Sequence, residues 1–442
     1  MRTYRELFRT PEFRPFFFTV AVQVAAQTVA GLGLATLVYR DTGSPLLSAL
    51  AMFGPSLAQM VGAATLLSAA DRLPPRAAVT GLALLFALST ALQVLPDLSV
   101  GTLFAILFVQ GLIGSVGGGV RMGLLGEILS RDGYLLGRSV LNVAVGVCQI
   151  AGYGAGGLLV AALSPRGALL TSASLYLAAA LVARLGLSRR APRASGRPSV
   201  AETWRINGRL WSSPARRRIY LALWVPNGLI VGCESLFVPW APEQAGTLFA
   251  CAAIGMLAGD VAVGRFVPKA WRGRLASPLQ ALLAAPFLLF ALDPALPLAL
   301  AAVTVATAGY AASLLFQEKL LALTPDELSG QALGLHSSGM LTFQGVSATL
   351  AGVLAQYTST TTAMALLAGL SLTVTAALVV AGRRTHAEER GHADEPGHDD
   401  EPGHAEERGT RDRKPGSALS LMTARRSEAG ATGRSRRRAE SE

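Results

Sequence analysis

Apolar residues occur along this chain in twelve long runs that are separated by short polar segments. A run of about 20 apolar residues crosses the hydrocarbon core of a bilayer as an α-helix. Because lipid offers no partner to backbone N–H and C=O groups, repeated runs of this length form helical bundles. The pattern predicts an all-α integral membrane protein with twelve spans, at residues 16–38, 46–69, 77–95, 101–123, 141–162, 166–187, 217–238, 246–267, 275–292, 296–316, 334–356 and 361–381.

Composition and charge agree with a membrane protein. Charged residues make up only 15% of the chain, against about 25% in soluble domains. If the N-terminus is inside, the inner segments hold 23 Lys and Arg residues, and the outer loops hold only Arg40 and Arg166. Since cytoplasmic loops carry the excess of positive charge, we expect a multi-pass protein of the cell membrane with both termini in the cytoplasm.

The net charge of +11 does not indicate a nucleic-acid-binding protein. This charge arises within residues 1–382, where it is spread over the loops, and residues 383–442 carry 13 basic and 13 acidic side chains. We therefore expect the lipid bilayer and a small-molecule substrate as partners, no nucleic acid, and a monomer.

The longest internal hydrophilic segment, residues 188–216, divides the twelve runs into two sets of six. We predict an N-terminal half at 1–187, a cytoplasmic linker at 188–216 and a C-terminal half at 217–382. The start of the linker is rich in Arg, Pro, Ser and Gly, which is typical of a loop. The part from Trp204 to Trp211 is either an amphipathic helix on the inner leaflet or a solvated stretch.

The tail, residues 383–442, repeats a charged hexapeptide. HAEERG at 386 is followed by HADEPG at 392, HDDEPG at 398 and HAEERG at 404. A segment with so few apolar residues cannot form a core, so we expect a disordered cytoplasmic tail. Histidines beside carboxylates also bind Zn²⁺ or Ni²⁺ in some sequences, and this alternative stays open for the tail.

The two halves repeat each other at matching positions. The second span of each half ends with an Asp that has Arg close behind it: Asp71 with Arg72 and Arg76, and Asp260 with Arg265. Such an Asp can cap a neighbouring helix and pair with Arg. We predict that these residues form a gate and charge relay that opens as the halves move, and the alternative is a static anchor of topology.

The fifth span of each half also shares a pattern, because Gln149 is followed eight residues on by Gly157 and Gln344 by Gly352. Repeated halves with a central linker are typical of secondary transporters. Gly152 and Gly156 add a GxxxG pattern. Small residues let helices approach closely, so we predict helix packing at Gly152, Gly156, Gly157 and Gly352.

Several motifs resemble the major facilitator superfamily, most of all the drug:proton antiporters and related exporters of actinobacteria. The segment A-D-R-L-P-P-R at 70–76 is similar to the family signature G-x-L-A-D-R-x-G-R-R, and residues 259–265 carry a related segment. Residues 152–157 are similar to the antiporter signature G-P-x-x-G-G, with Tyr153 at the proline position.

The fourth span carries a further part of the resemblance. Gln110-Gly111 is similar to the end of the family signature R-x-x-Q-G, and Leu107 occupies the arginine position. In the family this arginine is linked with proton coupling, so this chain departs from the family's usual proton route.

The resemblance implies the major facilitator fold, which has twelve spans in two pseudo-symmetric six-helix halves around a central cavity. Polar residues within the spans would line the cavity, or would hydrogen-bond between helices. For Arg121, the alternatives are an anionic substrate group, Glu127, or lipid headgroups. The candidates for the substrate cavity are Gln23, Gln27, Arg121, Gln149, Asn227 and Gln344.

Glu234 is the only acidic residue well inside a predicted span. Ionisable side chains within the membrane are costly and usually functional. We predict that Glu234 carries the coupling proton or contacts the substrate. The alternative is a hydrated residue near the outer interface.

No motif indicates an enzyme, since the chain has no nucleophile elbow, no metal-ligand cluster in a span and no GxxxxGK[ST] loop. We predict a secondary transporter without a cofactor that uses an ion gradient, H⁺ in the first instance, for efflux of a small organic molecule by alternating access. One alternative is proton-coupled uptake or facilitated diffusion. An alternative of another class is a membrane sensor or scaffold that does not transport.

Overall fold

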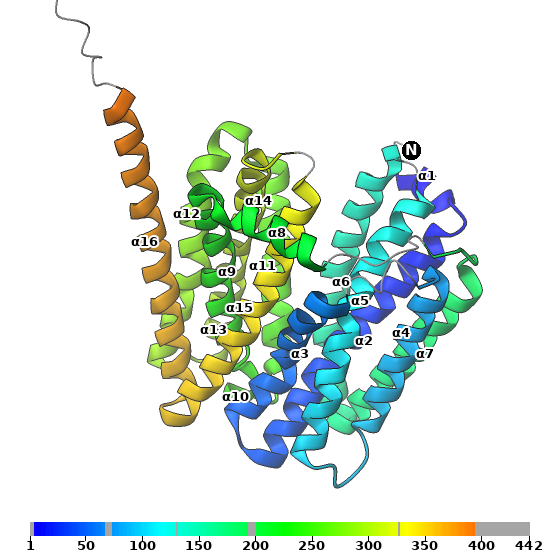
Figure 1. Cartoon of the computed structure of the whole chain (residues 1–442). Helices are drawn as coiled ribbons and strands as arrows, with labels where there is room; N and C mark the ends of the chain where they lie inside the picture. Colours follow the sequence, from blue (N-terminus) through cyan, green and yellow to red (C-terminus); the bar gives the residue numbers. More distant parts are fainter. Residues whose placement is uncertain (1–3, 67–72, 130, 193–199, 326–327, 394–442) are drawn as a thin grey trace, which may run out of the picture. The chain divides into compact units, whose positions relative to one another are not determined.

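Residues 4–66, 73–129, 131–192, 200–325 and 328–393 are described by the structure, a computed structural model (Figure 1). All regular elements of these residues are helices. Twelve helical stretches among them are long and apolar enough to cross a membrane. The prediction of an all-α fold with twelve spans is therefore confirmed.

The first half contains six spans, each formed by one helix. A short helix, α1 (Tyr4–Arg9), precedes them. Each predicted span overlaps one helix over most of its length. The six helices are α2 (Phe13–Thr42), α3 (Pro45–Leu66), α4 (Pro75–Leu92), α5 (Val100–Ile128), α6 (Arg131–Leu163) and α7 (Pro165–Gly186).

The second half also contains six spans, and three of them are interrupted. The first span is broken after Glu234, the third continues as a 3-10 helix, and the fourth has a short 3-10 segment in its middle. The elements are α9 (Pro214–Glu234) with α10 (Phe237–Trp240), α11 (Ala245–Phe266), α12 (Lys269–Ala284) with η2 (Ala285–Leu292), α13 (Leu296–Ala308) with η3 (Gly309–Ala311) and α14 (Ala312–Ala322), α15 (Ser329–Tyr357) and α16 (Thr360–Ala393).

Proline accounts for two of these interruptions. Pro239 lies inside α10 and Pro286 lies at the start of η2. A proline has no N–H for the carbonyl four residues earlier, and its ring crowds that carbonyl, so a continuous α-helix is disfavoured at both places.

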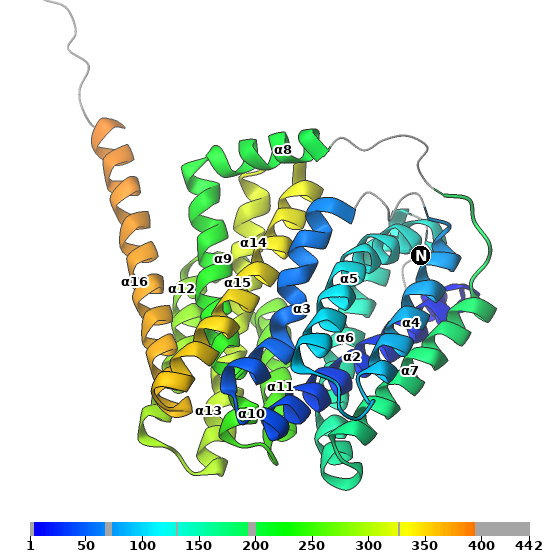
Figure 2. The ribbon, with the colours of Figure 1, turned by 60° about the horizontal axis from the view of Figure 1, so that its bottom comes forward.

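The helical bundle has two ends (Figure 2). We call the end that carries the linker the linker end, and the other the opposite end. At the linker end, Arg190 NH2 lies 2.5 Å from Glu12 Oε2 and Arg190 Nε lies 3.4 Å from Glu127 Oε2. These contacts join the linker to the start of α2 and the end of α5. The opposite end carries the turns between α2 and α3, between α6 and α7, and between α10 and α11.

Each half is held together by its own helix pairs. In the first half α2 packs against α6 and α7, and α3 against α5; in the second half α9 packs against α15 and α11 against α13. The most extensive contacts across the boundary between the halves join α3 with α15 and α6 with α11. Both pairs join the second span of one half to the fifth span of the other, so the boundary repeats the symmetry of the halves.

A large buried apolar cluster also joins the halves. Leu32 and Ala35 of α2 belong to the same cluster as Leu248 and Phe249 of α11. Tyr153 of α6 stacks on Phe249, with ring centroids 4.9 Å apart. These helix segments lie toward the opposite end, so apolar packing fixes the halves together there.

The linker contains the helix α8 (Val200–Ser212). Of the two alternatives for Trp204 to Trp211, the structure has a helix, and this helix extends beyond that segment at both ends. The Trp211 ring stacks on Trp224 of α9 with a centroid distance of 5.5 Å, and Gln331 of α15 donates to Asn207 Oδ1 at 2.9 Å. Trp204 is 62% exposed. The contacts attach α8 to the second half, and its position on a lipid surface stays a hypothesis.

The last helix corrects the predicted boundary of the tail. α16 runs to Ala393, whereas the last span was predicted to end at 381 and disorder to begin at 383. The first HAEERG segment is helical because Ala, Glu and Arg favour helices. Residues 394–442, with the later repeats and the alternative of a metal site, lie outside the described residues.

Candidate functional site

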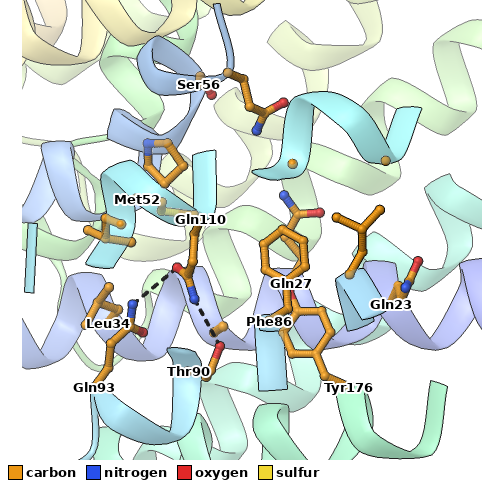
Figure 3. Close-up of a pocket in the computed structure, with 18 of the residues that line it drawn as sticks. Gln23, Gln27, Leu34, Met52, Ser56, Phe86, Thr90, Gln93, Gln110 and Tyr176 are labelled. Atoms are coloured by element: carbon orange, nitrogen blue, oxygen red, sulfur yellow. Dashed lines mark hydrogen bonds between the residues drawn. The ribbon is translucent and has the colours of Figure 1, made fainter. Parts of the chain in front are cut away.

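A cavity of about 220 Å³ lies within the first half, between α2, α3, α4, α5 and α7 (Figure 3). Helix packing explains its position, because α3 and α5 form one wall and α2, α4 and α7 form the other. Amides and hydroxyls interrupt the apolar lining. The polar side chains that line it are Gln23, Gln27, Ser56, Gln59, Thr90, Gln93, Gln110, Arg121 and Tyr176.

Near the opposite end of the bundle, some of these side chains form hydrogen bonds with one another. Gln93 Nε2 donates to Gln110 Oε1 at 3.2 Å, and Gln110 Nε2 donates to Ser89 Oγ at 2.6 Å and toward Thr90 Oγ1 at 3.4 Å. Figure 3 shows Gln110 between Gln93 and Thr90. The Gln93–Gln110 network therefore binds α4 to α5 and leaves few of its donors for a solute.

A second group of amides has no partner in the part of the chain that the structure describes. Among the described residues, Gln23, Gln27 and Gln59 make no side-chain hydrogen bond, and all three line the cavity. Gln23 and Gln27 lie one turn apart on α2, and Gln59 comes from α3. An amide offers donors and an acceptor, so these side chains can bind a solute that enters the cavity.

Arg121 is the only charged residue among those that line the cavity. It lies near the linker end of α5, and its Nε donates to the Gly117 carbonyl of the same helix at 3.3 Å. Within the described residues no carboxylate lies within 4.0 Å of its guanidinium. Glu127, one of the expected partners, pairs with Arg190 instead. A cation inside the bundle thus faces the cavity without a counter-ion from the part of the chain that the structure describes.

An aromatic pair forms part of the cavity wall. Phe86 of α4 and Tyr176 of α7 stack with centroids 5.4 Å apart and planes 19° apart. Among the described residues, the Tyr176 hydroxyl has no hydrogen-bond partner. The pair offers an apolar face and one free O–H donor to a solute.

The cavity includes only part of the predicted set. Gln23, Gln27 and Arg121 line it, whereas Gln149 of α6, Asn227 of α9 and Gln344 of α15 are not among its lining residues. Gln149 and Gln344 are half-buried, and Asn227 is buried with no partner for its Nδ2.

Six of the described polar side chains that line the cavity were not in the predicted set: Ser56, Gln59, Thr90, Gln93, Gln110 and Tyr176. Gln59 and Gln93 are polar residues within predicted apolar spans, and they line the cavity. The signal that selected Gln23 and Gln27 would have found both.

The predicted gate residues are described only in part. Asp71 and Arg72 lie outside the described residues. Arg76 stands in the first turn of α4, half-buried, with no partner for its Nε. Asp260 lies near the linker end of α11, half-buried, with a buried Oδ1 that has no partner, and Arg265 is exposed. No ion pair between Asp260 and Arg265 is present in this state.

The predicted packing glycines lie at two kinds of contact. Gly152 and Gly156 face α2 within the first half: a methyl group on Gly152 would overlap Thr28 Oγ1, and one on Gly156 would touch Val29 and Leu32 at 3.4 Å. These contacts let α6 approach α2 along one face.

Gly157 and Gly352 face the other half of the chain. A methyl group on Gly157 would lie 3.1 Å from Gly246 Cα, and one on Gly352 would lie 2.5 Å from Leu46 Cα. Both contacts lie toward the opposite end. A second cavity, of about 360 Å³, is also found there between α2, α6 and the start of α11, with Arg40 and Glu243 on its wall.

Glu234 is the last residue of α9, where the first span of the second half breaks. It is half-buried between Cys233 and Ser235, which are both buried. Among the described residues its carboxylate has no hydrogen bond or ion pair. Tyr310 lies within electrostatic range of both Glu234 and Asp260. Glu234 and Asp260 are thus two carboxylates of the spans without a cationic partner among the described residues, and Tyr310 lies near both.

Twelve spans in two halves, with a polar cavity inside the bundle, define a helical membrane transporter. The sequence profile of the Major Facilitator Superfamily matches residues 16–317. The chain belongs to this family. No curated protein matches it in sequence, and the finer resemblance to drug:proton antiporters stays a prediction.

Solved structures share the fold. A POT family transporter crystallised with 5-aminolevulinic acid matches with a TM-score of 0.67 and 12% identity, over 83% of this chain and 95% of that chain. A bacterial homolog of the human lysosomal transporter Spinster, inward-facing and unoccupied, matches with a TM-score of 0.63 and 14% identity, over 85% of this chain and 95% of that chain. At these identities the likeness shows the fold alone.

Proposed function

We propose that this protein exports a small organic molecule by alternating access, in exchange for protons. The observation that carries the proposal is the cavity of the first half, where Gln23, Gln27 and Gln59 have no partner, and Arg121 no counter-ion, among the described residues. Buried polar groups normally have partners. A solute that enters the cavity would supply them.

The contacts between the halves support alternating access. Tyr39 near the end of α2 donates to the Pro239 carbonyl of α10 at 3.3 Å, and Gln356 of α15 donates to Ser44 Oγ at 3.2 Å. Gly157 and Gly246 meet at the same end. If the linker end is cytoplasmic, as the charge distribution predicts, these contacts close the outer side, and transport requires them to open.

Glu234 and Asp260 are the proposed proton-carrying groups. A carboxylate inside a membrane bundle without a cationic partner is stabilised by taking up a proton. Glu234 lies at the break between α9 and α10, close to the outer contacts, and Asp260 lies toward the linker end. Movement of the halves would change the hydration of each group and so release or bind its proton.

One observation favours uptake or facilitated diffusion over export. Leu107 stands where the antiporter signature has an arginine, so the resemblance supports proton exchange less firmly than it supports the fold. Proton-coupled uptake or facilitated diffusion would use the same cavity and the same contacts between the halves.

Purified protein in liposomes with a pH-sensitive dye inside tests the proposal. Ethidium, tetracycline and benzoate are added in turn under an imposed pH gradient, and dye and solute are followed together. Solute moving against its own gradient, opposite to the proton, supports antiport. Movement in the same direction as the proton favours uptake, and absence of flux for a broad panel favours a sensor or scaffold.

A further inference from the structure

We infer that the cavity of the first half binds a small organic anion, whose acid group is held by Arg121 and whose body lies against Phe86 and the free amides. This inference rests on the proposed transport function, because it names the class of solute that the cavity takes.

Arg121 places a positive charge at the cavity. A guanidinium has five N–H donors, and only Nε of Arg121 bonds to the protein, at the Gly117 carbonyl. The four N–H groups of its terminal nitrogens have no acceptor among the described residues. An unpaired cation within a bundle is costly. A carboxylate or phosphonate is the planar or multi-oxygen acceptor that a guanidinium binds with two parallel hydrogen bonds.

The other residues of the cavity lining disfavour cationic and neutral solutes. No Asp or Glu is among the described residues that line the cavity, so a cationic solute would meet only the positive charge of Arg121. A neutral solute of the same size can offer the guanidinium only uncharged acceptors, whose hydrogen bonds are weaker than those of a carboxylate. The cavity therefore favours an anion over a neutral molecule or a cation.

Further donors lie beside the charge. The Tyr176 hydroxyl and the amides of Gln23 and Gln27 line the cavity and have no partners among the described residues. Gln23 lies toward the linker end of α2, as Arg121 does on α5. Acid oxygens beyond the two bound by the guanidinium can accept from these groups. At the other end of the cavity the Gln93–Gln110 network is already satisfied, so the acid group belongs at Arg121.

Size and shape restrict the body of the solute. A cavity of about 150 Å³ holds benzene, so a volume of about 220 Å³ accommodates one ring with a short acid-bearing chain. The Phe86–Tyr176 stack gives a flat apolar face for such a ring. An aromatic monocarboxylate meets these limits together with the charge.

Binding to the full-length protein in lipid nanodiscs tests the inference. The probes are benzoate, phenylacetate and cinnamate, each compared with its own amide, which has the same shape and no charge. Thermal unfolding is followed with increasing probe. We expect at least one acid to bind about tenfold more tightly than its amide, which corresponds to about 1.4 kcal/mol. Equal binding of every acid and amide, or no binding by any acid, would overturn the inference.

Substitutions at Arg121 locate the acid group. Arg121→Gln removes the charge and should abolish the preference for the acid, whereas Arg121→Lys should keep it. The matched control is Arg138→Gln, which removes an exposed positive charge near the same end of the bundle, outside the cavity lining. A preference that survives in Arg121→Gln, or that disappears in Arg138→Gln, would refute the assignment. The comparison of acid with amide in the unaltered protein decides the question if Arg121→Gln does not fold.

Flux measurements separate this inference from the proposed function. Transport of the amides at the same rate as the acids would support the proposed transport function and refute the anion site. Tight binding of an acid without flux of any probe would support the anion site and refute the proposed transport function.

Discussion

Gly157 of α6 and Gly246 of α11 lie backbone to backbone across the boundary between the two halves. A methyl group on Gly246 would lie 2.6 Å from Gly157 Cα and 2.8 Å from the Tyr153 carbonyl oxygen. Backbone atoms cannot move aside as a flexible side chain can. The close approach of the halves at this end therefore depends on the absence of both side chains.

Gly246→Ala should disfavour the state in which the halves meet at the opposite end. Overpacking costs about 1–3 kcal/mol, which is about a 5- to 150-fold change in an equilibrium between two states. We expect slower transport and greater access of a maleimide reagent to a cysteine placed at Gln244, on the wall of the second cavity.

The control for this change is Gly264→Ala, on the same helix, where a methyl group meets no atom within 4 Å. It should leave flux and labelling unchanged. Normal flux and labelling in Gly246→Ala would show that the glycine contact plays no part in the transport cycle.

Gly152→Ala should destabilise the first half itself. The added methyl group would overlap Thr28 Oγ1, which already bonds to the Val24 and Ala25 carbonyls of α2. We expect a loss of about 1–3 kcal/mol, measured as a lower midpoint of thermal unfolding. Gly154→Ala, two residues on in open space, is the matched control. Equal midpoints for the two variants would contradict the packing contact.

Glu234→Gln should separate proton movement from solute movement. Gln has the shape of the protonated acid and cannot release a proton. We expect flux driven by a pH gradient to be lost while exchange of solute at equal pH persists. Glu243→Gln, at an exposed acid in the turn between α10 and α11, should behave as the unaltered protein. Unchanged pH-driven flux in Glu234→Gln would assign Glu234 to the hydrated interface.

Arg190 should stabilise the linker end in a pH-dependent manner. Burial alone would raise the pKa of Glu12, but hydrogen bonds from Ser188 and Arg190 and the charge of Arg190 outweigh it and hold this pKa below its ordinary value. A carboxyl whose pKa is lowered by folding adds stability above its unfolded pKa and loses it as the pH falls through the folded pKa.

Arg190→Gln should therefore lower the free energy of unfolding at neutral pH, by about 1 kcal/mol or less since the pair is partly exposed. The difference from the unaltered protein should shrink in acid, where Glu12 is protonated. Arg189→Gln, at an exposed neighbour, is the control. A stability difference that is the same at neutral and acid pH would exclude the ion pair as its cause.

The twelve spans could be predicted because lipid imposes length and hydrophobicity on every one of them. The breaks in the spans are less visible in sequence. The break after Glu234 depends on where Pro239 falls relative to the carbonyls of its own helix, and apolar composition does not report it. α16 extended past its predicted end because charged residues also form helices outside lipid.

The cavity could be predicted only in part. Gln23 and Gln27 were both candidates for the cavity, and both line it because residues four apart share one face of a helix. Gln149 and Gln344 lie on spans that also contain polar positions, yet they do not line the cavity. The rotation of each helix about its axis is set by its packing partners, α6 on α2 and α15 on α3. Sequence spacing within one helix does not contain this information.

Asp260→Asn should change the balance between the two states of the transporter. The Asp260 carboxylate lies near the linker end of α11 with a buried Oδ1 that has no partner in the present state. A buried acceptor without a donor is costly, so we expect Asp260 to gain a donor when the linker end closes. Asn keeps the shape and loses the charge, and it should weaken closure there.

We expect the Asp260→Asn variant to reach the membrane in normal amount and to keep normal thermal stability, but to show strongly reduced flux. Asp293→Asn is the control, because Asp293 lies at the opposite end of the same half and is exposed, and Asn keeps the oxygen that accepts from Trp240 Nε1. If Asp260→Asn loses flux only in proportion to its amount in the membrane, Asp260 serves folding and topology, and the predicted gate at this end of α11 is wrong.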